Sequence, residues 1–70
     1  MKLLTNEEIG KKVRKLREER NLSKEEFSKE TGIPLSNLDL LEEGKFVAAL
    51  DIYIICKAFS VDVEDLISDK

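Results

Sequence analysis

Residues 22–45 read LSKEEFSKETGIPLSNLDLLEEGK, and they predict two short helices joined by a tight turn. Ser23 and Glu26 have the spacing of a capping box, in which each side chain accepts a hydrogen bond from the backbone N–H of the other residue. Gly32 is typical of the position after a helix, because glycine adopts the left-handed conformation without strain. The first of the two helices therefore runs from about Ser23 to just before Gly32.

The second helix of this stretch is predicted to begin at Pro34 or Leu35, since proline is tolerated in the first turn of a helix. Leu38 and Leu41 lie three residues apart and face the core. Glu43-Gly44 ends the helix. A helix–turn–helix unit is therefore expected across residues 22–45.

A third helix is expected before this unit. Thr5 and Glu8 form a second capping box and place its start at Thr5. Asn21 is a plausible stop, because asparagine tolerates the left-handed conformation. The apolar stripe of this helix consists of residues at helical spacing, namely Ile9, Val13 and Leu16.

Two more helices are expected after a loop over residues 45–49. Asp62, with Asp65, is predicted to start the last one, in which Leu66 and Ile67 close the core. The helix before it has apolar residues at offsets of zero, three, four and seven, namely Ile52, Ile55, Cys56 and Phe59. Cys56 is expected to act as a small buried hydrophobe.

The fold class that follows is all-α, a compact bundle of five short helices. The chain has 70 residues, which is enough for one domain, predicted over residues 1–70 with its core at about 5–68. It has only three glycines and one proline, too few of the residues that favour turns for an all-β fold.

Composition excludes several functions. The chain has no histidine, and Cys56 is its one cysteine, so no disulfide framework, zinc site or Cys/His catalysis is expected. It has no Gly-rich phosphate loop and no activated nucleophile, so we expect neither an enzyme nor a cofactor or small-molecule ligand. Without an apolar segment long enough for a signal peptide or a membrane span, a cytoplasmic protein with no membrane partner is expected.

Charge is unevenly distributed along the chain, whose net charge is −3. Residues 2–29 contain nine basic and six acidic residues, whereas residues 30–70 contain three basic and nine acidic residues. Affinity for phosphates depends on the local patch that faces them. In the first helix, Lys11 and Lys12 are interpreted as part of a solvated face with Glu18 and Glu19 nearby.

The sequence resembles the phage-repressor and Cro-like (XRE-type) helix-turn-helix family, whose fold is lambda-repressor-like. The likeness spans about residues 7–67 and rests on the spacing of many elements. The matching residues are Ile9-Gly10, Arg14, Leu16-Arg17, Leu22–Phe27, Thr31–Ile33, Leu38, Leu41–Lys45 and Lys57–Ile67.

This resemblance implies sequence-specific binding of double-stranded DNA by a transcriptional regulator. The helix at about Pro34–Glu43 would lie in the major groove, and Lys24 and Lys45 would contact phosphates. Arg17 and Glu42 would form an ion pair between the first and third helices. The resemblance places base-contacting positions at the exposed side of the groove helix, at Pro34, Leu35, Ser36, Asn37 and Leu40.

A homodimer on a palindromic site is also implied, because family members often dimerise through the fourth and fifth helices. Tyr53, Ile54 and Ile67 are the expected interface residues. Ser36 and Asn37 could contact base edges or simply face solvent.

A different class of function stays open, namely a protein-interaction module on the same fold. Leu35 and Leu40 would then pack against a protein partner instead of DNA. The apolar groove helix and the negative charge of Asp39 and Glu43 favour this alternative. Lys24, Lys45 and the intact layout of the helices favour DNA.

Overall fold

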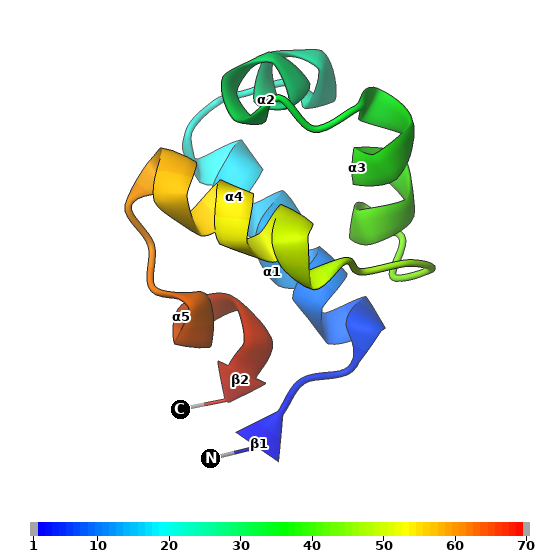
Figure 1. The fold of residues 1–70 in the computed structure, drawn as a ribbon, viewed down its shortest axis with the longest axis vertical. Coiled ribbons are helices and arrows are strands. Elements are labelled where there is room, and N and C mark those ends of the chain that lie inside the picture. The colour runs from blue at the N-terminus through cyan, green and yellow to red at the C-terminus, as the bar shows by residue number, and fades with distance from the viewer. Residues whose placement is uncertain (1, 70) are drawn as a thin grey trace.

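Five helices and one short strand pair make up the part of the chain that the computed structural model describes, residues 2–69 (Figure 1). The predicted fold class, an all-α bundle of five short helices, is confirmed. The elements in chain order are β1 (Lys2–Leu3), α1 (Asn6–Glu19), α2 (Lys24–Thr31), α3 (Leu35–Glu42), α4 (Ala49–Phe59), α5 (Val63–Ile67) and β2 (Ser68–Asp69).

Both predicted capping boxes are present and fix the starts of α1 and α2. The backbone N–H of Thr5 donates to Glu8 Oε1 at 2.9 Å, and the N–H of Glu8 donates to Thr5 Oγ1 at 3.2 Å. The N–H of Ser23 donates to Glu26 Oε1 at 2.8 Å, and the N–H of Glu26 donates to Ser23 Oγ at 3.1 Å. These bonds satisfy N–H groups that a helix start would otherwise leave without a partner.

Left-handed residues follow the ends of four helices, and Gly44 after α3 has a φ of 74°. Asn21 has a φ of 57° just after α1, and Gly32 has a φ of 78° at the end of α2, as the sequence predicts. Ser60 ends α4 in the same conformation, with a φ of 55°. Each of these residues changes the direction of the chain in a short connection, so the next helix can begin within a few residues.

The core lies where the helices meet (Figure 1). Phe27 of α2 and Phe59 of α4 stack with ring centroids 5.0 Å apart, and the guanidinium of Arg20 lies 5.1 Å from the centroid of the Phe59 ring. Ile33, which the sequence places in a turn, is buried as well. The buried apolar residues are Ile9, Val13, Leu16, Phe27, Ile33, Leu38, Leu41, Ile52, Ile55, Cys56 and Leu66.

The C-terminal segment differs from the sequence prediction in two ways. Lys2–Leu3 and Ser68–Asp69 form an antiparallel pair that no sequence pattern indicated, so the two ends of the described chain lie side by side (Figure 1). Asp62 does precede α5, but its side chain accepts no capping hydrogen bond.

The prediction that Lys12 belongs to a solvated face is wrong. Its side chain is half-buried instead of belonging to a solvated face, and Lys12 Nζ donates to the carbonyl oxygen of Asp65 at 2.9 Å. A cation at the end of α5 stabilises the carbonyl groups that the helix leaves without partners. Lys12 therefore fastens α5 to α1.

No helix in residues 2–69 combines the length and the hydrophobicity needed to cross a membrane.

Candidate nucleic-acid interface

Helix α3 has one buried face and one exposed face. Leu38 and Leu41 are fully buried, because they point into the core from the inner side of the helix. The start and the outer side of α3 are exposed at the predicted positions Pro34, Leu35, Ser36 and Leu40, whereas Asn37 is half-buried. These five predicted residues therefore lie at the start and along the outer half of one short helix.

The turn between α2 and α3 is fixed by two hydroxyl groups. Ser28 Oγ donates to the carbonyl oxygen of Ile33. Thr31 Oγ1 donates to the carbonyl oxygen of Phe27 at 2.8 Å and accepts from the N–H of Ile33 at 3.2 Å. The side chain of Ile33 is buried in the core and so holds the turn against the rest of the fold. Together these contacts set the direction in which α3 leaves α2.

The carboxylate of Glu42 fastens the end of α3 to α1. Arg17 Nε lies 2.8 Å from Glu42 Oε2, and Arg17 Nη2 donates to Glu42 Oε1 at 3.1 Å, so the pair is bidentate. Arg17 Nη1 also donates to the carbonyl oxygen of Leu22 at 2.8 Å, which ties in the start of the α2 segment. The hydrogen bonds to Glu42 raise the pKa of the Arg17 guanidinium. This is the interhelical position at which the resemblance placed an ion pair.

Arg14 is a second partner of Glu42 that the sequence analysis did not identify. Arg14 Nε lies 3.5 Å from Glu42 Oε1, and the Glu42 side chain has no exposed surface. A buried carboxylate needs several donors to compensate for the loss of water. Arg14 lies one turn before Arg17 on α1, and this spacing could have indicated its role.

Gly10 lets α1 and α3 approach closely. A Cβ atom at this position would lie 2.5 Å from the carbonyl oxygen of Leu41 and 2.8 Å from that of Glu42. Both neighbours are backbone atoms at the end of α3, so they cannot move aside as a side chain would. Any side chain at Gly10 would therefore shift α3 relative to α1.

Both lysines that were predicted to contact phosphate have carboxylate partners. Lys24 Nζ lies 3.1 Å from Asp39 Oδ1, so the first turn of α2 is joined to the middle of α3. Lys45 Nζ lies 3.1 Å from Glu43 Oε1, directly after α3. Sequence reasoning identified the lysines but not this pairing, because residues 24 and 39 meet only in the folded chain.

Apolar side chains continue the exposed face beyond the end of α3. The N–H groups of Lys45 and Phe46 both donate to the carbonyl oxygen of Leu40, at 2.9 Å and 3.3 Å. The chain thus folds back beside Leu40, and the side chain of Phe46 is exposed there. We call Leu35, Ser36, Asp39, Leu40, Glu43 and Phe46, with Lys24 and Lys45, the α3 surface.

The predicted dimer residues lie away from the α3 surface. Tyr53 and Ile54 are on α4, where Tyr53 is exposed and Ile54 is half-buried. Ile67 ends α5 and is also half-buried, because it packs against the core. Cys56, on the inner side of α4, is buried as expected, and burial followed by the carboxylates of Asp62 and Asp65 raises the pKa of its thiol.

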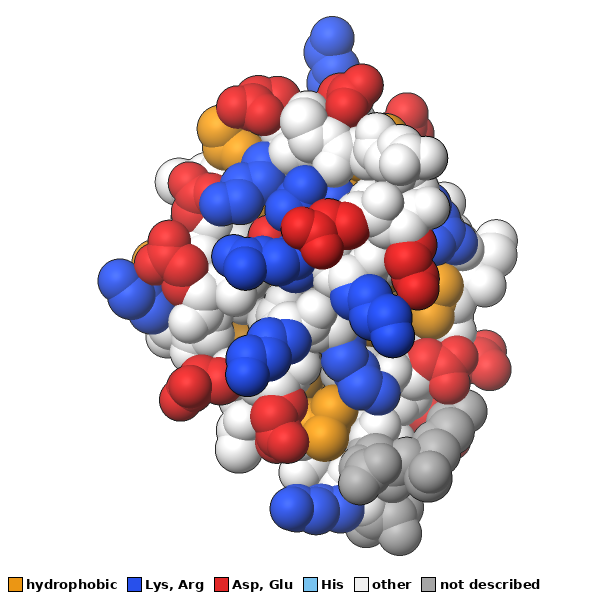
Figure 2. All heavy atoms as spheres, turned by 180° about the vertical axis from the view of Figure 1, so that it is seen from behind, with side chains coloured by type: hydrophobic (Ala, Val, Ile, Leu, Met, Phe, Trp, Pro, Cys, Tyr) orange, Lys and Arg blue, Asp and Glu red, His pale blue; other side chains and the backbone are white. Residues whose placement is uncertain are grey.

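The side of the molecule on which α1 lies has a mixed charge. Figure 2 shows the molecule from behind, where α1 lies, and Lys and Arg side chains gather across its middle with Asp and Glu side chains among them. Lys11, Arg14 and Lys15 are exposed residues of α1. The exposed face of α1 therefore has the mixed pattern of a solvated helix.

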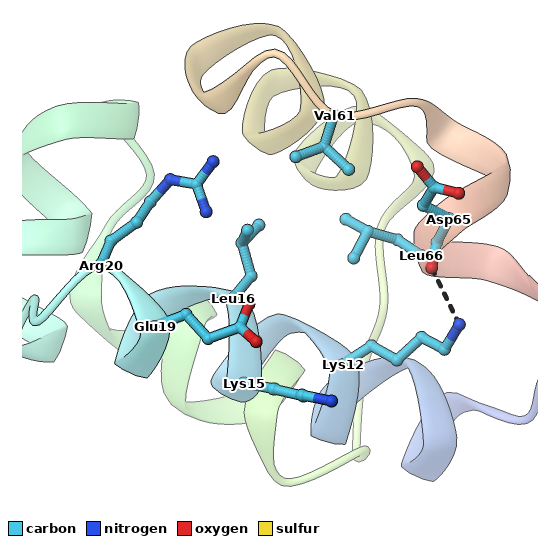
Figure 3. A pocket seen from close by; sticks show the side chains of 8 residues that line it. All are labelled: Lys12, Lys15, Leu16, Glu19, Arg20, Val61, Asp65 and Leu66. Carbon is cyan, nitrogen blue, oxygen red and sulfur yellow. Dashed lines mark hydrogen bonds between the residues drawn. The ribbon is translucent and has the colours of Figure 1, made fainter.

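A shallow groove of about 430 Å³ lies between α1 and the C-terminal segment. Leu16, Val61 and Leu66 point toward one another in its middle, and charged side chains surround them (Figure 3). No residue of α3 lines this groove. It is therefore separate from the α3 surface.

Comparisons with known proteins agree with this architecture. A model of the Cro/C1-type helix-turn-helix DNA-binding domain matches residues 12–70. Among solved structures, the chain is similar in fold to the restriction-modification controller protein C.AhdI from Aeromonas hydrophila, with a TM-score of 0.79 and 24% sequence identity over 87% of this chain and 94% of that one. No curated protein matches the chain. The resemblance seen in the sequence is confirmed, and the chain belongs to the Cro/C1-type helix-turn-helix DNA-binding domain family.

Proposed function

We propose that the chain is a transcriptional regulator that binds double-stranded DNA sequence-specifically, with α3 in the major groove. The observation that best supports this proposal is the position of α3. Its inner face is fixed by Leu38, Leu41 and Glu42, while its outer face is open along its length. The major groove is wide enough to admit an α-helix of this kind.

The exposed side chains of α3 suit contacts with bases. Ser36 can donate to or accept from a base edge, and Asn37 suits adenine. Leu35 and Leu40 can contact the methyl group of thymine. We therefore propose a site in which A·T pairs face the start and the middle of α3, while Lys24 and Lys45 contact the flanking phosphates.

We further propose that the protein binds as a homodimer, in the cytoplasm, to a palindromic site. Leu50, Tyr53 and Ile54 form an apolar row on α4 at helical spacing, with Leu50 and Tyr53 exposed. The exposed Val63 lines a small groove together with Tyr53, and Ile67 lies one helical turn after Val63 on α5. A two-fold interface here would set two copies of α3 about 34 Å apart on one side of the duplex.

The direct test is an unbiased selection of duplexes at about 50 mM and about 200 mM salt, since phosphate contacts weaken over this range. We expect one enriched motif with two-fold symmetry. Failure to enrich any motif, together with weak binding at low salt, would contradict the proposal.

The alternative function is a protein-interaction module on the same fold. Leu35, Leu40 and Phe46 are exposed apolar side chains on the α3 surface, and both lysines there are already paired with carboxylates. The two functions differ in their response to salt. DNA binding weakens as salt rises, by about −0.9 per phosphate contact in a plot of log affinity against log salt, whereas an apolar protein contact hardly changes.

A further inference from the structure

The two ion pairs on the α3 surface have the same arrangement. In each, a lysine that flanks α3 is paired with a carboxylate of α3 or of the residue after it. The Lys24 and Asp39 side chains are 33% and 44% exposed, and those of Lys45 and Glu43 are 69% and 46% exposed. All four groups are therefore accessible to a duplex that approaches α3.

Pairs of this kind are weak enough to exchange partners. Exposed ion pairs contribute about 0–1 kcal/mol, so a phosphate can replace the carboxylate as the partner of either lysine. After the exchange, however, the carboxylate still lies within a few ångströms of the phosphate. At this distance salt hardly screens the repulsion, because the Debye length is about 8 Å at physiological ionic strength.

We propose that Asp39 and Glu43 keep non-target DNA unbound by weakening the phosphate contacts of Lys24 and Lys45. This inference rests on the proposed DNA-binding function and adds a role for two carboxylates to it. Non-specific DNA binding depends almost entirely on phosphate contacts. Carboxylates beside Lys24 and Lys45 reduce the binding free energy of these phosphate contacts for every sequence equally.

A target sequence compensates for this loss through contacts that other sequences cannot make. Ser36, Leu35 and Leu40 gain base contacts only when the correct edges face them. Asp39 and Glu43 therefore lower the affinity for all DNA by a similar factor. Non-target DNA, which has only phosphate contacts, is then left largely unbound, whereas a target sequence is still held by its base contacts.

The test measures the affinity of Asp39→Asn, Glu43→Gln and the double variant for a short random-sequence duplex by fluorescence anisotropy. We expect each single variant to bind several-fold more tightly, and the double variant about tenfold more tightly. The plot of log affinity against log salt steepens by about 0.9 for each lysine that is freed. Glu64→Gln, an equal charge change on α5, is the matched control and should leave both quantities nearly unchanged.

A double-mutant cycle shows whether Asp39 acts through Lys24. In a Lys24→Gln background, Asp39→Asn should change the affinity for the random duplex much less than in the original chain. A thermal melt of each variant checks that the fold is retained.

The inference is overturned if Asp39→Asn and Glu43→Gln behave like Glu64→Gln, or if the Asp39→Asn effect is the same with and without Lys24. The failure of the proposed function looks different. In that case no variant binds any duplex at low salt, and the selection enriches no motif.

Discussion

Glu42 lies with its carboxylate fully buried between two arginines of α1. Three contacts of at most 3.5 Å join it to Arg14 and Arg17. A buried pair of this kind adds little to stability compared with an apolar pair, but the loss of one partner leaves the other charged and buried. At this site the pair also fixes the end of α3 relative to α1.

Replacing Glu42 is expected to destabilise the fold strongly. Glu42→Ala should lower the free energy of unfolding by about 3–5 kcal/mol, because Arg17 would stay buried without its carboxylate. Lys45→Ala removes only an exposed pair and should leave the melting temperature nearly unchanged. Thermal and urea denaturation of the two variants are the measurements. Equal melting temperatures would refute this role of Glu42.

Gly10 offers a second test at the scale of one residue. Alanine usually stabilises a helix by about 1 kcal/mol relative to glycine. At Gly10, however, the added Cβ would meet two backbone oxygens of α3 at 2.5 Å and 2.8 Å. We expect Gly10→Ala to destabilise the fold by about 1–3 kcal/mol, as overpacking does.

Lys11→Ala is the matched control, because Lys11 is exposed on the same helix and should tolerate the change. Urea denaturation measures both variants. A Gly10→Ala variant that is as stable as the original chain would show that α1 and α3 do not need this close approach.

At the scale of elements, the starts of α1 and α2 depend on charged capping residues. The backbone N–H of Thr5 lowers the pKa of Glu8 more than any other group, and the side chain of Thr5 contributes next. The backbone and the side chain of Ser23 lower the pKa of Glu26 in the same order. A carboxylate whose pKa is lower in the folded state stabilises the fold when it is ionised.

The pH dependence of stability follows from these pKa shifts. The contribution is fully present well above the ordinary glutamate pKa of about 4.3 and is lost as the pH falls through the lowered folded-state values. Glutamine keeps the capping geometry without the charge. The Glu8→Gln/Glu26→Gln variant should therefore be less stable than the original chain at about pH 6, with the difference shrinking toward about pH 3.

Urea denaturation across this pH range measures the difference directly. A difference that stays constant from neutral to acid pH would mean that the charge of these glutamates does not act on the fold.

The helices were predictable because their signals are local. The two capping boxes join residues three positions apart, Thr5 with Glu8 and Ser23 with Glu26. Gly32 indicates the end of a helix because glycine adopts the left-handed conformation without strain. These features depend on neighbours in sequence, so the pattern alone indicates where each helix begins or ends.

Contacts between distant residues could not be predicted in this way. Lys24 and Asp39 lie on different helices, and the angle between these helices is set by the turn that the hydroxyl groups of Ser28 and Thr31 fix. The pairing of Lys2–Leu3 with Ser68–Asp69 joins segments too short to show a strand pattern. The sequence therefore indicated which helix carries the candidate site, but not the charge balance of that surface.

At the scale of the whole molecule, α3 presents no cation of its own to DNA. Its sequence, LSNLDLLE, contains two acidic residues and no basic residue. In the proposed complex, phosphate contacts near α3 would come from flanking elements, through Lys24 and Lys45. A single copy bound in this way would have a weak electrostatic attraction to DNA, and two copies on one site would double it.

This distribution predicts a shallow salt dependence on the selected target duplex. Two phosphate contacts give a slope no steeper than about −2 per protomer in a plot of log affinity against log salt, and the carboxylates paired with Lys24 and Lys45 make it shallower still. Fluorescence anisotropy across a salt series provides the slope. A much steeper slope would show that other cations, such as those on the exposed face of α1, also contact the duplex.

The proposed DNA interface is the α3 surface. The most direct measurement is an NMR titration of the ¹⁵N-labelled protein with the selected duplex, following each backbone amide. We expect the largest shift changes at Lys24 and across residues 35–46. Changes confined to α4, α5 or the groove beside Leu16, with α3 unaffected, would contradict it.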